Sequence, residues 1–163
     1  MIKKLVLISV CIILSFQFPL EDYIKAPDSS YSYTHVSTIE QFGVKGYVLN
    51  FTSVTWNYYG VDLPTWRHWV IIMKPPKISS KTALLFFDEG NRDQSAPTKM
   101  PPELLYAALD TETINVIVFS IPVQPLMFSD ERKNRTEDPI IAYTWDKCLK
   151  NSSDPAVVSL FFS

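Results

Sequence analysis

The stretch TALLFFDEGNRDQSAPTKMPPELLYAALDTETINVIVFSI, residues 82–121, decides the fold. It begins with an unbroken apolar run at 83–87 and ends with a second one from Asn115 to Ile121. Short apolar runs of this kind are typical of strands buried on both faces of a parallel sheet. Between them, Pro101 and Pro102 open a segment with the apolar spacing of a helix. The apolar positions of this segment are Leu104, Leu105, Ala108 and Leu109.

Strand, helix and strand in this order predict a parallel βαβ unit. Residues 31–73, which precede it, predict antiparallel strands with a turn at 42–46. In residues 47–54, Tyr47, Leu49 and Phe51 fall on one face, and Asn50 and Thr52 fall on the other. We expect the face that carries Asn50 to be the solvated one.

A second helix is predicted to start at Asp138, with Asp138 as N-cap and Pro139 in the first helical position. Its apolar stripe consists of Ile141, Trp145, Cys148 and Leu149. We therefore expect Cys148 to be buried as a small hydrophobe, although pairing with another molecule is the alternative for a lone cysteine. The parallel part of the fold then spans about residues 82–150.

The amino terminus predicts export from the cytosol. Lys3 and Lys4 precede an apolar run from Leu5 to Phe16, the layout of a secretory signal peptide. The run is too short for a membrane-spanning helix, which takes about 20 apolar residues. We expect cleavage near Ser15 to Gln17, a signal peptide at 1–17, and a secreted chain at 18–163 without stable membrane insertion. A membrane anchor is the alternative.

Three tripeptides match the acceptor pattern for asparagine-linked glycans, which agrees with secretion. The acceptors are Asn50, Asn134 and Asn151. The net charge of −2 and the lack of a basic run argue against nucleic acid as a partner. Neither His35 nor His68 has neighbours at metal-ligand spacing, so the sequence predicts neither a metal site nor a cofactor.

Two further motifs carry a resemblance to a known family. The residues Trp66-Arg67-His68-Trp69 and the longer run from Glu137 to Lys147 resemble the PhoPQ-activated pathogenicity-related proteins, and the likeness extends over about residues 19–150. That family includes an autocrine repressor of proliferation, and its members are longer and similar to α/β-hydrolases. The resemblance implies a single incomplete domain, the front portion of an α/β-hydrolase-like fold.

The resemblance also directs a search for catalytic residues, and the search finds none. None of the four glycines flanks a serine as in Gly-x-Ser-x-Gly, and both histidines precede the region where a general base belongs. The resemblance implies that the loop after Phe87 is the oxyanion loop, with Gly90 and Asn91 as the candidate residues. Asp88 and Glu89 in that loop would oppose a developing oxyanion. We therefore predict no hydrolase turnover.

The remaining polar and aromatic clusters have simpler interpretations. His68 is expected to be a structural, hydrogen-bonded residue and His35 a surface residue. The charged loop 130–135 is either solvated or a receptor contact. The aromatic cluster of Trp56, Tyr58 and Tyr59 is either core packing or a ligand face.

Three functions fit these observations. The chain is a secreted, non-enzymatic signal that binds a cell-surface receptor, or an inactive front fragment of a secreted ester or peptide hydrolase, or a truncated product without a function of its own. The apolar run Val157 to Phe162 is typical of the start of another strand. We expect the strand from Asn115 to Ile121 to lack a neighbour unless that run fills the edge, and hence expect self-association.

Overall fold

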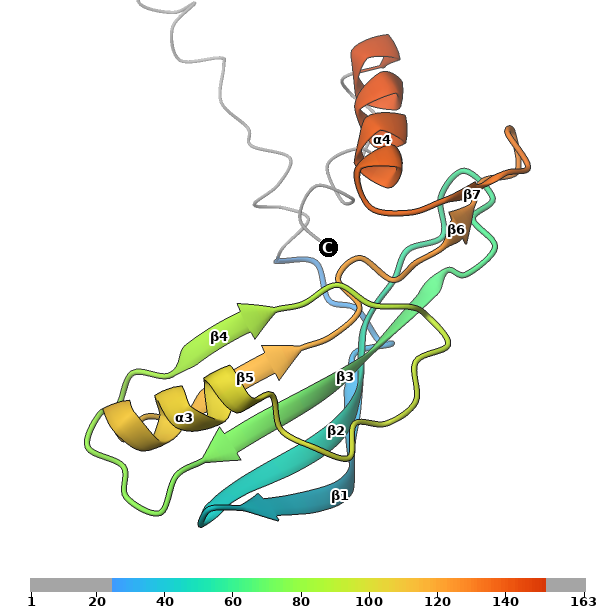
Figure 1. Cartoon of the computed structure of the whole chain (residues 1–163). Coiled ribbons are helices and arrows are strands. Elements are labelled where there is room, and N and C mark those ends of the chain that lie inside the picture. The colour runs from blue at the N-terminus through green and yellow to red at the C-terminus, as the bar shows by residue number, and fades with distance from the viewer. Residues whose placement is uncertain (1–24, 152–163) are drawn as a thin grey trace, which may run out of the picture.

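The computed structural model describes residues 25–151, which form a mixed five-stranded sheet with two helices (Figure 1). Three antiparallel strands come first: β1 (Ser32–Gln41), β2 (Val44–Thr55) and β3 (Thr65–Lys74). Then follow β4 (Leu84–Phe87), helix α3 (Pro102–Thr111) and β5 (Asn115–Val118). The strand order is β1-β2-β3-β5-β4, and β4 pairs with β5 in parallel. The predicted antiparallel part and the βαβ unit are both confirmed.

The hairpin between β1 and β2 turns in two residues. Phe42 and Gly43 both have positive φ, 50° and 81°, and Gln41 pairs directly with Val44. Two central residues with positive φ match the twist of a tight hairpin. The turn is therefore shorter than the predicted 42–46, and Val44 already belongs to β2.

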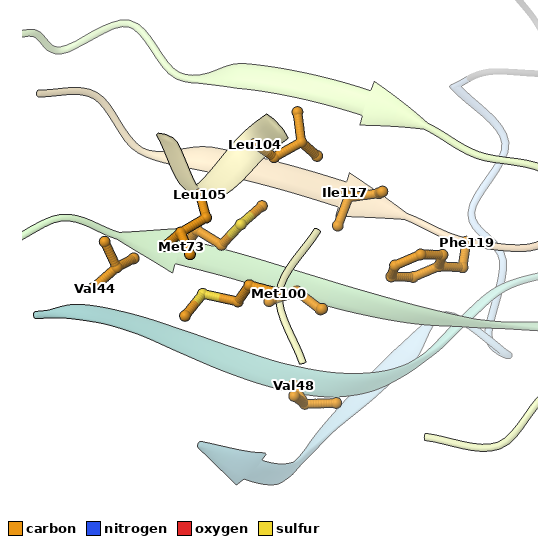
Figure 2. Close-up of a cluster of buried hydrophobic side chains, with 9 residues drawn as sticks. Val44, Val48, Met73, Met100, Leu104, Leu105, Ile117 and Phe119 are labelled. Carbon is orange, nitrogen blue, oxygen red and sulfur yellow. The ribbon is translucent and has the colours of Figure 1, made fainter. Parts of the chain in front are cut away.

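One hydrophobic core lies between the sheet and α3 (Figure 2). The helix contributes Leu104 and Leu105, and Ala108 is buried beside them, as the helical spacing predicts. The sheet and the loop before α3 complete this core with Val44, Val48, Ile71, Met73, Met100, Ile117 and Phe119. A Cβ on Gly46 would lie 2.8 Å from Met100 Sδ and 3.2 Å from Ile71 Cγ2, so a larger residue here would require these core side chains to shift.

The buried face of β2 is not the expected one. Val44, Gly46 and Val48 face the core, whereas Tyr47 and Leu49 are only half-buried. Asn50 follows Val48 by two residues, so it shares the core-side face and is itself half-buried. The strand is confirmed, but the face assignment is wrong because α3 covers the side with smaller apolar residues. Burial alternates only from Val44 to Val48, and residues 49–54 are all half-buried.

The burial predicted for β4 is also wrong. All four of its side chains are exposed, between 39 and 64%. Among the described residues, β4 forms the edge of the sheet and has a neighbour on one side only, whereas β5 is paired on both sides. Within this range the open edge belongs to β4 and not to the strand that begins at Asn115, and the run Val157 to Phe162 lies outside the described residues.

Helix α4 (Asp138–Lys150) begins one residue away from the predicted cap. Glu137 is the N-cap, with φ of 45° and no side-chain cap hydrogen bond, and Asp138 is the first helical residue. Ile140, Tyr143 and Thr144 are buried, whereas the predicted buried positions Ile141, Trp145 and Leu149 are 47, 51 and 88% exposed. The predicted stripe is therefore the outer face of the helix. The Cys148 side chain is not among those that the structure describes.

A second hydrophobic core lies where β2 ends and β3 begins. Its buried members are Trp56, Val61, Trp66, Val123, Leu126, Phe128, Ile140 and Tyr143. Phe128 follows the short strand β6 (Leu126–Met127), which pairs with β7 (Asn134–Arg135), and these strands lead into α4 (Figure 1). Trp56 is fully buried and Tyr59 packs against this core, whereas Tyr58 is 38% exposed, so core packing holds for two of the three predicted aromatic residues. No helix between residues 25 and 151 is both long enough and apolar enough to cross a membrane.

Candidate functional site

Two adjoining hollows lie beside the carboxyl ends of β4 and β5, the edge of an open α/β sheet where ligands usually bind. The first, which we call the polar hollow, has a volume of about 140 Å³. It is lined by Asn50, Arg67, His68, Trp69, Asn91, Arg92, Gln94 and Ser120. The second, which we call the apolar-sided hollow, has a volume of about 310 Å³. It is lined by Leu63, Pro64, Thr65, Arg67, Arg92 and Val123.

The loop after β4 forms one wall of the polar hollow. Its backbone is held by hydrogen bonds from Arg92 N–H to Gln124 O (2.7 Å) and from Gln94 N–H to Asn91 O (3.0 Å). Gly90 lies so close to Ser120 that a Cβ would be 2.7 Å from Ser120 Oγ. A larger residue at 90 would therefore push the loop away from β5.

The predicted oxyanion residues lie in this loop. Asn91 lines the polar hollow, and among the described residues no hydrogen bond engages the N–H groups of Gly90 and Asn91. The loop is nevertheless acidic, since it carries Asp88, Glu89 and Asp93, and the negative charge of the nearby Glu137 carboxylate raises the pKa of Glu89. The oxyanion-loop interpretation stays a prediction.

Ser120 is a site residue that sequence reasoning missed. It is buried at the end of β5 and has φ of 63°, a conformation uncommon for residues other than glycine. Its Oγ donates to Asn91 O at 3.3 Å. Backbone strain of this kind is frequent at ligand sites. No sequence signal marked it, since its hydrogen-bond partner lies about 30 positions away in the chain.

His68 and Ser53 have the spacing of a base and a nucleophile. His68 Nε2 lies 2.8 Å from Ser53 Oγ, and His68 Nδ1 lies 3.1 Å from the carbonyl oxygens of both Phe119 and Ser120. Since carbonyls only accept, Nδ1 carries the proton and Nε2 accepts from the Ser53 hydroxyl. The register of β2 shifts between Thr52 and Val54, which is where Ser53 turns toward the histidine.

This pair is structural in the present geometry. Ser53 lines neither hollow, so a substrate in them would not meet its hydroxyl. The imidazole instead ties β2 and β3 to the end of β5, as expected for a hydrogen-bonded structural histidine. Burial lowers the pKa of His68 below its ordinary value of 6.5. His35 is an exposed residue of β1, with Nε2 3.0 Å from Thr38 Oγ1.

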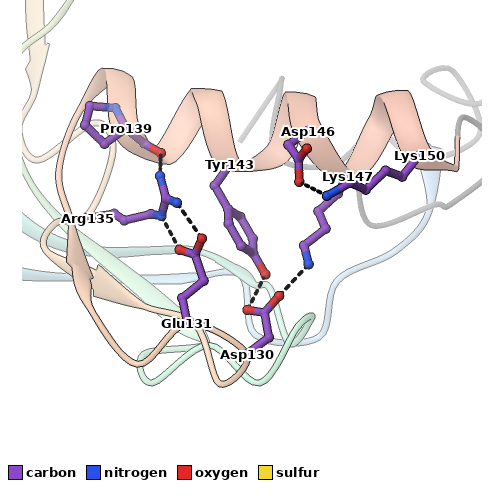
Figure 3. A network of polar contacts seen from close by, with 8 residues as sticks. All are labelled: Asp130, Glu131, Arg135, Pro139, Tyr143, Asp146, Lys147 and Lys150. Atoms are coloured by element: carbon purple, nitrogen blue, oxygen red, sulfur yellow. Dashed lines mark hydrogen bonds and ion pairs between the residues drawn. The ribbon is translucent and has the colours of Figure 1, made fainter.

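Three side chains of the charged loop 130–135 are bound by the protein itself (Figure 3), and the other three are exposed to solvent. Asp130 accepts hydrogen bonds from Tyr143 Oη at 2.9 Å and from Lys147 Nζ, and the Lys147 contact lowers the pKa of Asp130. Glu131 pairs with Arg135 through two hydrogen bonds, and Arg135 Nη1 donates to Pro139 O at 2.7 Å. The network fastens α4 to the loop, which restricts any receptor contact here to the remaining exposed side chains.

In the part of the chain that the structure describes, no three His, Cys, Asp or Glu side chains are grouped so that they could hold a metal ion.

The three glycan acceptors differ in access. Asn50 is half-buried and lines the polar hollow, whereas Asn134 and Asn151 are exposed, in β7 and directly after α4.

When the chain is made in a eukaryotic secretory pathway, we expect a glycan on Asn134 and none on Asn50, because the amide must reach the transferase. Peptide mapping by mass spectrometry checks this, with Thr136→Ala as the control that removes the Asn134 acceptor. A glycan found mainly on Asn50 would contradict the prediction.

Comparison with known proteins gives two matches. The family model described as PhoPQ-activated pathogenicity-related protein matches residues 20–162. Autocrine proliferation repressor protein A of Dictyostelium discoideum is 36% identical over 157 residues, which cover 95% of this chain and 32% of that protein. The chain thus spans about a third of the length of this relative. No solved structure matches the chain.

Proposed function

The chain belongs to the PhoPQ-activated pathogenicity-related protein family, and from this premise we propose that it is a secreted, non-enzymatic signal that limits proliferation by binding a cell-surface receptor. The observation that carries the proposal is the 36% identity to an autocrine proliferation repressor over 95% of the chain. An autocrine factor has to leave the cell that makes it. The Lys3-Lys4 pair and the apolar run that follows supply a leader at 1–17, with one domain at 18–163.

The outer face of α4 supplies a surface for the receptor. Ile141 and Leu149 are exposed on the side of the helix opposite Ile140 and Tyr143. An amphipathic helix that shows apolar residues at this spacing fits a groove on a partner. The Asp130 network holds α4 in place, so binding need not order the helix first.

Binding of the labelled protein to the cells that produce it tests this proposal. We expect saturable binding that unlabelled protein displaces. Ile141→Ser combined with Leu149→Ser should weaken it at least about tenfold, because buried apolar anchors dominate such interfaces. Val36→Ser changes an exposed apolar residue of β1 and serves as the matched control. Binding that does not saturate, or that both variants reduce equally, would contradict the receptor surface.

A second function is favoured by the open edge at β4. In this alternative the chain is the front part of an α/β-hydrolase-like ester or peptide hydrolase, whose nucleophile and base lie outside it. The βαβ unit, the loop between β4 and α3, and the 32% coverage of the relative support this interpretation. Under either function, the chain alone is expected to give no turnover of small activated esters and no labelling by a serine-directed fluorophosphonate.

The β4 edge leads to a prediction about association. Leu84 N–H donates to Ile114 O and Asp88 N–H donates to Val118 O, so the alternate residues Leu85 and Phe87 turn their backbone groups away from β5. An apolar edge with unpaired backbone groups recruits another strand. We expect concentration-dependent self-association in sedimentation velocity, reduced by Leu85→Lys.

The control for this experiment is Val36→Lys on the opposite edge strand. The register of β1 shifts between His35 and Ser37, and such irregularities protect an edge from pairing. This variant should associate like the wild type. A wild type that stays monomeric at high concentration would show that the β4 edge is self-sufficient.

A further inference from the structure

We propose that the two hollows together bind a small carboxylic acid with an apolar tail, whose carboxylate is held by Arg67. The inference goes beyond the proposed function, because it concerns the sheet edge and not the α4 surface. Arg67 and Arg92 line both hollows, so the hollows adjoin at these two side chains. A ligand that spans both spaces must therefore pass beside two guanidinium groups.

The charge at this junction is positive, because none of the acidic side chains of the loop after β4 lines either hollow. Arg67 is exposed and makes no ion pair with any residue in the described range. Arg92 donates from Nη1 to Asp62 Oδ2 at 2.7 Å, while Asp62 Oδ1 also accepts from Met127 N–H at 2.9 Å. Asp62 therefore offsets Arg92 alone, and one positive charge is left uncompensated. A guanidinium presents donors in a planar fork that matches a carboxylate.

The walls of the polar hollow supply the remaining hydrogen-bonding groups. Asn50, Asn91 and Gln94 carry amides, and Ser120 carries a hydroxyl. Trp69 Nε1 donates to Gln94 O at 2.8 Å, which fixes the backbone of the loop against β3. A volume of about 140 Å³ equals that of roughly four or five water molecules, which suits a carboxylate head group.

The apolar-sided hollow suits the tail of the same ligand. Leu63, Pro64 and Val123 form its apolar wall, and its volume of about 310 Å³ accommodates roughly ten water-sized groups. An anion without a tail would leave this apolar wall exposed to water, and an uncharged apolar ligand would leave Arg67 without a partner. The chemistry that satisfies both hollows is a monocarboxylate with a short aliphatic or aromatic tail.

Fluorine NMR titration with 4-fluorophenylacetate tests the proposal, with 4-fluorophenylacetamide as the uncharged probe of the same shape. We expect saturable binding of the acid, at least about tenfold tighter than the amide and weakened by salt. Arg67→Gln should weaken binding of the acid at least about tenfold, and Arg67→Lys should weaken it less. Leu63→Ser should weaken binding through the tail.

Lys81→Gln removes an exposed cation outside both hollows and should leave binding unchanged. The urea midpoints of the variants show that each one is folded. Equal affinity for acid and amide, or unchanged binding in folded Arg67→Gln, overturns the carboxylate site. Full displacement by an equal concentration of inorganic phosphate overturns the role of the tail. Cell binding through α4 uses other residues, so either proposal can fail alone.

Discussion

Replacing Phe128 with alanine is expected to lower the free energy of unfolding by about 3–5 kcal/mol, the largest effect that we predict for a single side chain. Phe128 is fully buried and stacks on Tyr143, with ring centroids 3.9 Å apart and an interplanar angle of 10°. Its ring also meets Trp56 edge-on at 6.2 Å. It therefore joins α4 to the end of the sheet, and its loss leaves a cavity on both sides.

Urea unfolding followed by tryptophan fluorescence measures this effect. Phe128→Leu should recover part of the stability, since it refills some of the volume. Met127→Ala is the control, because Met127 is the residue next to Phe128 and its side chain is 36% exposed. A loss below about 1 kcal/mol for Phe128→Ala would show that the second core is loosely packed.

The second large effect is expected from His68→Leu, which keeps the size of the side chain but removes its hydrogen bonds. The carbonyls of Phe119 and Ser120 and the hydroxyl of Ser53 then lose a partner. Orphaned buried groups cost about 1–3 kcal/mol each, and we expect a total loss of about 2–4 kcal/mol. Ser53→Ala removes only one bond and should cost about 1 kcal/mol.

His68 also gives stability a specific pH dependence. Burial lowers the pKa of the folded imidazole below 6.5, while the unfolded chain takes up its proton near that value. The unfolded state then binds more protons, so stability falls as the pH drops below about 6.5. Urea midpoints at pH 7.5 and 5.5 should differ more in the wild type than in His68→Leu. The lowered pKa values of Asp62 and Asp130 act only at more acidic pH.

The parts of the fold that the sequence predicts are those set by local periodicity. The α3 face with Leu104 and Leu105, the βαβ order and the antiparallel strands all follow from spacing. The buried face of α4 does not follow from spacing, because two stripes of the helix carry apolar residues. Phe128 and the ion-paired Asp130 select the stripe with Tyr143, and both lie outside the helix. The exposure of β4 likewise depends on its position at the edge of the sheet, which the local sequence does not determine.

The candidate site was harder to predict, because distant segments build it. Arg67 belongs to β3 and Arg92 to the loop after β4, and only the order β3-β5-β4 brings them to one hollow. The contact between Ser53 and His68 requires the register shift in β2, which no local pattern signals. Asn91 is a candidate only through the family resemblance, which implies an oxyanion loop after Phe87.

Growth of the producing cells in medium that contains the purified protein tests the proposed function most directly. We predict slower, dose-dependent proliferation with the wild type and with Ser53→Ala, to the same extent. Ser53 is the hydroxyl that the structure places beside His68 Nε2, so an equal effect is the result expected of a signal that needs no covalent chemistry. Unchanged growth at concentrations that saturate cell binding, or an effect lost in folded Ser53→Ala, would contradict a non-enzymatic repressor.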